Sequence, residues 1–139
     1  MIVQTQSLER RTTSGTDILD ITGDVAQAVR DAGIEEGQVL VFVPGSTAAV
    51  TTIEFESGVV QDLADAIERM APAGMPYAHD ARWGDGNGYS HVRAALTGAS
   101  LVIPVVDGGL LLGTWQQVVL CDFDNRPRNR RLVIQVMGR

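Results

Sequence analysis

The chain has 139 residues, of which 45% are hydrophobic and 20% charged, and this predicts one globular domain rather than a disordered or fibrous chain. Eleven basic and seventeen acidic residues give a net charge of −6, which argues against nucleic acid as a partner because phosphate backbones would be repelled. No signal segment is recognisable and no stretch reaches the roughly 18 apolar residues of a membrane span, so no membrane association and a cytoplasmic location are expected.

The first half of the chain is predicted to contain three strands and one helix before a second helix begins. Residues 2–8 alternate in character, as in a strand with one exposed face. Residues 23–32 carry apolar side chains at helical spacing, and Gly33 follows where a helix often stops. The apolar runs 38–43 and 48–55 predict two further strands, with a Pro-Gly-Ser-Thr loop between them.

The second half is predicted to begin with helices and to end with strands only. An apolar stripe predicts a helix whose side chains pack in the core, and the stripe consists of Val60, Leu63, Ala64, Ile67 and Met70. Residues 89–96 are expected to form a short helix. Residues 101–112 have the pattern of a hairpin with an Asp-Gly-Gly turn. Strands are predicted at 117–123 and 132–137.

This order of elements predicts an α+β fold over residues 1–139 as a single compact domain. The helices do not alternate regularly with strands, so an antiparallel, sheet-rich core with two main helices and one short helix is favoured over a doubly wound sheet. Cys121 lies in the predicted strand 117–123 and is expected to be a buried thiol, because a single cysteine has no internal partner for a disulfide.

The segment 79–91 is the strongest candidate for a functional site. It contains both histidines of the chain, His79 and His91, together with Asp80, Asp85 and three glycines. Imidazoles, carboxylates and backbone N–H groups in such a short stretch suit a ligand or metal site. Two other interpretations stay open, because the histidines could be hydrogen-bonded structural residues and residues 85–88 could be a plain turn.

Other residues are candidates on chemical grounds. Four arginines late in the chain could hold a small anion or lie solvated beside a turn, and these are Arg126, Arg128, Arg130 and Arg131. Glu54 ends an apolar strand, where a carboxylate is costly unless it is exposed or paired, and is a candidate ligand or base. Ser46 and Thr47 offer hydroxyls to an anion. Trp115 and Gln116 could hold a heteroaromatic ring, or they could be a core tryptophan and a strand-edge glutamine.

Three blocks of the sequence together resemble the YjbQ family of small proteins, often called secondary thiamine-phosphate synthase-like. The first is Val-Pro-Gly-Ser-Thr-Ala-Ala-Val at 43–50, leading to Ile53-Glu54. The second is Tyr-Ala-His-Asp at 77–80 with Asp-Gly-Asn-Gly at 85–88 and His91. The third is Leu-Gly-Thr-Trp-Gln at 112–116, and the similarity runs along almost the whole chain.

The resemblance implies a β-sandwich-like core, a homotrimer, and a pocket near the subunit boundary that takes a small phosphorylated molecule. The implied reaction joins a hydroxymethylpyrimidine diphosphate to a thiazole phosphate and releases pyrophosphate. His79, Asp80, Asp85 and His91 are the implied catalytic residues, with the two aspartates placed to hold Mg²⁺. The substrate-binding candidates are Ser46, Thr47, Glu54, Gly86, Asn87, Gly88, Thr114, Trp115, Gln116, Arg128 and Arg130.

One departure from the family pattern concerns the metal. Many relatives carry histidine at the position of Gly45, and that histidine forms a group of three with the equivalents of His79 and His91. Without it the candidate ligands His79, Asp80 and His91 must be completed by Glu54 or water, or no metal binds, so Mg²⁺ is expected rather than permanent Zn²⁺. Two rival functions are a non-catalytic protein that binds a phosphorylated metabolite and a metal-dependent phosphohydrolase.

Overall fold

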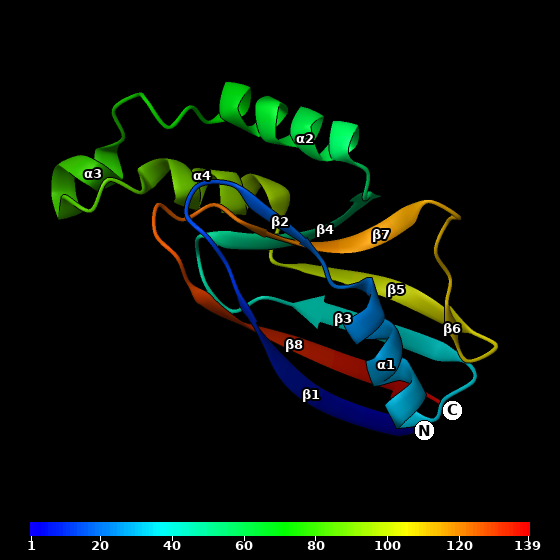
Figure 1. Cartoon of the computed structure of the whole chain (residues 1–139). Coiled ribbons are helices and arrows are strands. Elements are labelled where there is room, and N and C mark those ends of the chain that lie inside the picture. The colour runs from blue at the N-terminus through cyan, green and yellow to red at the C-terminus, as the bar shows by residue number, and fades with distance from the viewer.

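The computed structural model describes residues 1–139 and contains two antiparallel sheets in separate layers (Figure 1). The larger sheet has the order β1-β8-β3-β5-β6, with β1 at Ile2–Arg11, β8 at Asn129–Gly138, β3 at Gly37–Phe42, β5 at Ser100–Val106 and β6 at Gly109–Leu110. The smaller sheet has the order β2-β7-β4, with β2 at Asp17–Asp20, β7 at Gln116–Asp122 and β4 at Ala48–Glu54. The expected antiparallel α+β fold is therefore confirmed.

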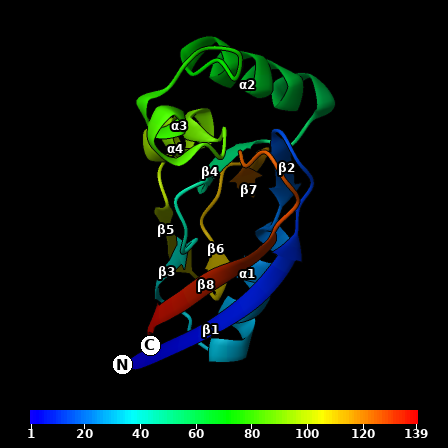
Figure 2. The same ribbon diagram turned by 90° about the vertical axis from the view of Figure 1, so that its left-hand side faces the viewer.

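Four helices accompany the sheets, namely α1 at Thr22–Ala32, α2 at Ser57–Met70, α3 at Ala78–Trp83 and α4 at Gly88–Thr97. Figure 2 shows α2, α3 and α4 together on one side of the smaller sheet, away from β1 and β8. None of the helices has the length and apolar character needed to cross a membrane. Helix α1 packs into the core between the sheets, so no helix covers the outer face of the larger sheet.

The smaller sheet is buried on both faces, and the alternation along β7 shows how. Val118 and Leu120 belong to the main core between the sheets, to which α1 contributes Val25 and Val29. Cys121, which points the other way, belongs to a second cluster beneath α2 and α4. Burial raises the pKa of the Cys121 thiol to about 12, so the expected inert buried thiol is present.

The prediction that the whole apolar stripe of α2 packs in the core is wrong at its end. Ile67 is buried, whereas Met70 is 61% exposed. At that end of α2 the neighbour from α4 is the buried guanidinium of Arg93, which donates to the Ala71 carbonyl and pairs with Glu68. Because a polar group lies where α2 ends, no apolar pocket is available for the last residue of the stripe.

The short elements are those that the sequence did not predict. β2 has only four residues, and α3 carries no buried residue, so neither shows a hydrophobic period. The hairpin is present with Asp107 and Gly108 both at positive φ, as its turn requires, but its second strand is limited to Gly109–Leu110. The chain thus has one helix more than the three that were expected.

Candidate active site

A polar pocket of about 400 Å³ lies where the smaller sheet, α3 and α4 meet the beginning of β8. Most of one wall comes from the helical segment and consists of His79, Trp83, Asp85, Asn87 and His91. The other wall comes from the loop before β4 and from the start of β8, and consists of Gly45, Ser46, Thr47, Arg128 and Arg130. Two of the three family blocks and two of the four arginines therefore meet in one place.

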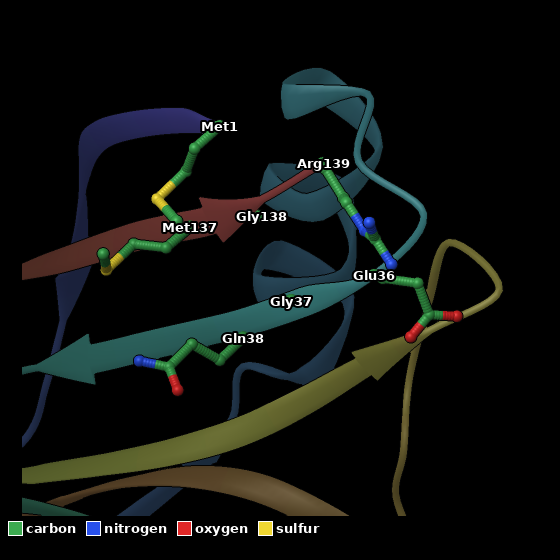
Figure 3. Close-up of a pocket in the computed structure, with 7 residues that line it drawn as sticks. All are labelled: Met1, Glu36, Gly37, Gln38, Met137, Gly138 and Arg139. Atoms are coloured by element: carbon green, nitrogen blue, oxygen red, sulfur yellow. The ribbon is translucent and has the colours of Figure 1, made fainter.

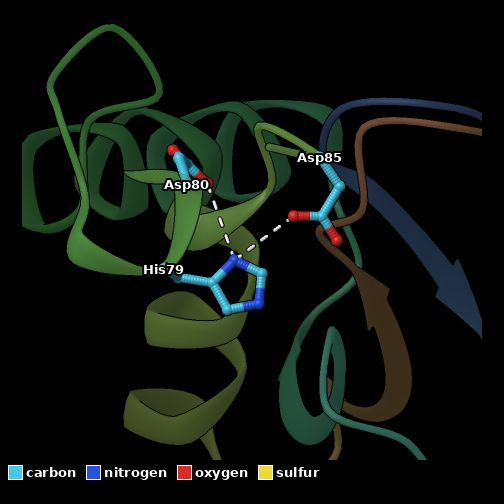
Figure 4. Close-up of side chains that lie close together, drawn as sticks. All are labelled: His79, Asp80 and Asp85. Carbon is cyan, nitrogen blue, oxygen red and sulfur yellow. Dashed lines mark ion pairs between the residues drawn. The ribbon is translucent and has the colours of Figure 1, made fainter. Parts of the chain in front are cut away.

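His79 forms a compact group with the two aspartates of its segment (Figure 4). Its Nδ1 lies 3.6 Å from Oδ1 of Asp80 and 3.5 Å from Oδ1 of Asp85. This nitrogen is buried and has no hydrogen-bond partner in the protein. The ring of His91 lies against that of His79, with centroids 4.4 Å apart. The structural interpretation of His79 as a hydrogen-bonded histidine is therefore not supported at Nδ1.

The loop between α3 and α4 brings these groups together. Gly84 ends α3 in the left-handed region with φ of 72°. Asp80 then accepts a hydrogen bond from the backbone N–H of Gly88 at 2.8 Å, which ties α3 to the first turn of α4. A Cβ on Gly88 would lie 2.5 Å from Cβ of Tyr77, so only glycine allows this approach. Since the Gly88 N–H is occupied, the expectation that it binds an anion is wrong.

The group His79, Asp80 and Asp85 has donor atoms that suit a divalent cation. One ligand atom from each residue lies within 4.8 Å of the others. Ligand atoms about 2.1 Å from a shared ion would stand roughly 3.0–3.4 Å apart, close to the distances from Nδ1 to the two carboxylates. The expected ligands were His79, Asp80 and His91, but the third member of the group in the structure is Asp85 and not His91. One imidazole and two carboxylates match Mn²⁺ or Zn²⁺ as well as Mg²⁺.

The arginine wall rests on two buried carboxylates, Asp122 and Asp124, both with fully buried side chains. Asp122 follows Val118 and Leu120 in the alternation of β7 and points to the space between the sheets. Arg130 points there from β8 and donates to Asp122 through Nε at 2.7 Å and Nη2 at 3.0 Å. The remaining nitrogen, Nη1, has no hydrogen bond and would lie 3.3 Å from a Cβ at Gly45. It is a free donor facing the pocket.

Asp124 holds the second arginine and the amide of the opposite wall. It accepts from Nε of Arg128 at 2.8 Å and from Nδ2 of Asn87 at 3.3 Å. Burial raises the pKa of Asp124, but hydrogen bonds from the Asn125 backbone, Arg128, Asn87 and Thr47 outweigh it and hold the pKa below its ordinary value. The pKa of Asp124 is lower in the folded than in the unfolded protein, so its ionisation stabilises the fold at pH values above the ordinary carboxyl pKa. This stabilisation is lost as the pH falls through the folded pKa.

Two predicted substrate-binding residues, Thr47 and Asn87, have other contacts. Thr47 donates to Asp124 at 3.0 Å and accepts from Nη2 of Arg130 at 2.6 Å, so its hydroxyl is already engaged. Asn87 uses its amide N–H on Asp124, and its buried Oδ1 has no partner. Because Oδ1 is an acceptor, this end of Asn87 does not suit a phosphate oxygen. Ser46 is exposed and makes no hydrogen bond within the protein.

The remaining predicted residues lie elsewhere in the chain. In the β4–β7 ladder, Ala48 pairs with Asp122 beside the pocket, whereas Glu54 pairs with Gln116 at the opposite end. Six residues of strand at about 3.3 Å each separate those ends by roughly 20 Å. Thr114, Trp115 and Gln116 therefore do not reach this pocket within one chain. Trp115 is 71% exposed, so the alternative of a core tryptophan is wrong. Gly86 supplies a turn with φ of 70° and does not line the pocket.

Sequence reasoning missed Asp122 and Asp124, although a signal was present. Asp122 ends the apolar strand β7 and Asp124 lies two residues beyond it, so the argument that applies to Glu54 applies to them as well. Arg128 and Arg130 follow within eight residues and offer the opposite charge, so they could have been recognised as partners of Asp122 and Asp124. Of the four arginines, Arg126 and Arg131 are exposed and line no part of the pocket.

Fold and pocket define a class of small antiparallel α+β proteins with imidazoles, carboxylates and guanidinium groups at one end of the smaller sheet. A family model described as UPF0047 protein YjbQ-like matches residues 6–139. A UPF0047 protein of Methanothermobacter thermautotrophicus is 38% identical over 139 residues, which cover 100% of this chain and 95% of that protein. The UPF0047 protein YugU of Bacillus subtilis is 33% identical over 96% of this chain and 98% of its own. The chain belongs to the YjbQ family.

Solved structures agree with this assignment. A hypothetical protein of Aeropyrum pernix superposes with a TM-score of 0.91 and 33% identity, over 98% of this chain and 99% of that one. A YjbQ/UPF0047 family protein of Clostridium acetobutylicum gives a TM-score of 0.88 at 30% identity, over 95% and 99%. The β-sandwich-like arrangement that the resemblance implied is therefore shared along the full length.

Proposed function

We propose that the pocket binds a phosphorylated small molecule and catalyses the transfer expected from the family resemblance, the joining of a hydroxymethylpyrimidine diphosphate to a thiazole phosphate. The thiazole nitrogen would form a bond to the methylene carbon of the pyrimidine, while the bond from that carbon to the diphosphate oxygen breaks. The diphosphate leaves with the electron pair as pyrophosphate. The observation that carries the proposal is the meeting of anchored arginines and unanchored imidazoles in one pocket.

The charges of the pocket limit how it can hold an anion. Asp122 and Asp124 balance Arg128 and Arg130, so the arginine wall is neutral as a whole. Its contribution is directional, because Arg130 is fixed by two hydrogen bonds to Asp122 and one to Thr47 and offers Nη1 to a phosphate oxygen. On the opposite wall Asp85 lines the pocket, and Asp80 lies beside it across His79; neither carboxylate pairs with an arginine or lysine. A bound diphosphate therefore needs positive charge beside these aspartates.

His79, Asp80 and Asp85 are the residues that would hold a divalent cation, which when bound supplies charge neutralisation to the diphosphate. His91 is left free of carboxylate contacts and lies at the pocket wall. In its protonated form it donates a hydrogen bond to the departing diphosphate oxygen and stabilises the charge that develops there. Ser46 donates to a phosphate oxygen from the facing loop. No step requires a protein nucleophile.

The first experiment measures product formation by the purified chain with the pyrimidine diphosphate, thiazole phosphate and Mg²⁺. Thiamine phosphate and pyrophosphate are expected in equal amounts. Replacing His91 by alanine is expected to lower the rate by about 10²–10⁴-fold, since general acid catalysis contributes on that scale. The parallel variant also excludes a contaminating synthase.

Two rival functions are separated by the same assay. Release of inorganic phosphate from either substrate alone would identify a phosphohydrolase. Binding of both substrates without turnover would identify a metabolite-binding protein. Equal rates for the parent chain and His91→Ala would contradict the role assigned to His91.

We also propose, from the same resemblance, that three copies associate through the outer face of the larger sheet. Val3, Phe42, Val102 and Val106 are 39–58% exposed, and the strand pairing places them on this one face. A hollow of about 600 Å³ lies at one end of the face. Figure 3 shows its lining residues, which include Met1 and Arg139 at the two chain termini. Several large apolar side chains exposed on one sheet face are typical of an interface.

Light scattering after gel filtration tests the association. The expected mass is three times the chain mass of 14.9 kDa. Val102→Lys places a charge on this face and is expected to give the monomer mass, because an unpaired charge is costly to bury. A monomeric parent chain, or an unchanged mass for the variant, would contradict the proposed interface.

A further inference from the structure

The polar pocket continues into a second hollow of about 370 Å³ on the far side of His91. The two hollows share Gly45, Ser46 and His91, so they form one cleft with two ends. The second end lies between α4, the start of β4 and the turn before β5. Its other lining residues are Ala48, Ala94, Ala95, Gly98 and Ala99.

The walls of this second hollow have almost no hydrogen-bonding capacity. The five residues that belong to it alone have at most a methyl side chain. The carbonyls of Gly98 and Ala99 accept from the backbone N–H groups of Val50 and Val43, at 3.0 and 2.9 Å, and are therefore engaged. The hollow is apolar, in contrast to the adjoining pocket of charged side chains. A surface hollow lined by small apolar side chains beside a polar pocket is suited to the apolar part of a ligand.

A second observation points to a ligand that spans the cleft. Asn87 is 6% exposed and lines the polar pocket, and its buried Oδ1 has no hydrogen-bond partner. A buried acceptor without a donor is costly, and a ligand N–H or O–H group would satisfy it. The ligand therefore combines an anionic group, a hydrogen-bond donor and an apolar part.

We propose that the second hollow binds the compact ring of a phosphorylated ligand whose phosphate lies in the polar pocket. This inference rests on the proposed function and names where its substrate ring lies. The ring contacts Ala95 and Ala99 on one side and the imidazole of His91 at the boundary. Whole drug-sized ligands occupy cavities from about 300 Å³ upward, so one ring is accommodated. Ring selection thus falls to the alanines of α4 and not to Trp115, which lies at the opposite end of the smaller sheet.

Calorimetric titrations with methyl phosphate and benzyl phosphate in the presence of Mg²⁺ test the inference. Both share the phosphate, and only the second carries a ring. Benzyl phosphate is expected to bind the parent chain about tenfold more tightly or better, because the ring leaves water. In Ala95→Leu this advantage is expected to fall below about twofold, with methyl phosphate affinity unchanged within about twofold.

Ala95 is exposed on a helix and leucine is a good helix former, so the variant is expected to fold. Ala26→Leu on α1 lines no cavity and is the matched control; it should keep the full preference for benzyl phosphate. If both phosphates bind the parent chain equally, or Ala95→Leu keeps the preference, the ring site is wrong while the phosphate pocket stands. If neither phosphate binds, the proposed function fails as well.

Discussion

Replacing Asp122 by alanine is expected to lower the free energy of unfolding by about 3–5 kcal/mol, because one partner of a buried ion pair is removed. Arg130 is 8% exposed and would lose two hydrogen bonds. The hydroxyl of Thr12 and the backbone N–H of Asp124 would lose their acceptor as well. Since domains are stable by only about 5–15 kcal/mol, this single change is expected to unfold a large share of the molecules on mild heating.

Urea denaturation followed by circular dichroism measures the effect. Asp85→Ala is the matched control, because this carboxylate lines the same pocket but its side chain is 54% exposed. Its substitution is expected to change the free energy of unfolding by less than about 0.5 kcal/mol. A loss below about 1 kcal/mol for Asp122→Ala would be close to the effect of a surface substitution and would show that the arginine wall does not depend on Asp122.

Asp85→Asn is expected to weaken the binding of a divalent cation by about 10–100-fold or more. Mutation of residues that only hydrogen-bond a metal ligand already lowers metal affinity by that factor. The change keeps the size of the side chain and removes the negative charge that faces Nδ1 of His79. Mn²⁺ is the suitable probe, because it accepts nitrogen and oxygen ligands and its binding can be followed directly by electron paramagnetic resonance.

Asp62→Asn on the exposed side of α2 removes the same charge at a distance from the pocket and should leave Mn²⁺ affinity unchanged. Competition by Mg²⁺ then reports which ion the group prefers. If the parent chain binds no Mn²⁺, or the Asp85→Asn variant binds it equally well, the cation site assigned to His79, Asp80 and Asp85 does not exist.

The part of the site that the sequence predicted is the part that is local in the chain. His79, Asp85, Asn87 and His91 lie within one short segment, and a loop with two glycines at positive φ turns it back on itself. Their proximity needs no knowledge of the sheets. The same holds for the stripe of α1, whose buried residues have the spacing of one helical face.

The part that could not be predicted depends on strand register. Asp122 and Glu54 are both carboxylates at a strand end, yet one is fully buried and the other is exposed. The difference arises because β7 ends beside Arg130 of β8, a contact between distant segments. Trp115 illustrates the converse, since its hairpin lies at the end of β7 away from the pocket. Asp122 and Trp115 could be placed only if the strands that pair with each end of β7 were already known.

The most direct test of a phosphate-binding pocket between the histidines and the arginines is calorimetric titration of inorganic pyrophosphate with Mg²⁺ into the parent chain and His91→Ala. His91 makes no hydrogen bond from its side chain within the protein, so its loss should leave the fold intact. We predict one pyrophosphate per chain and an affinity reduced about tenfold or more in the variant, the value of one charge-assisted hydrogen bond. No binding to the parent chain, or equal affinity for both, would contradict the assignment of this pocket to phosphate chemistry.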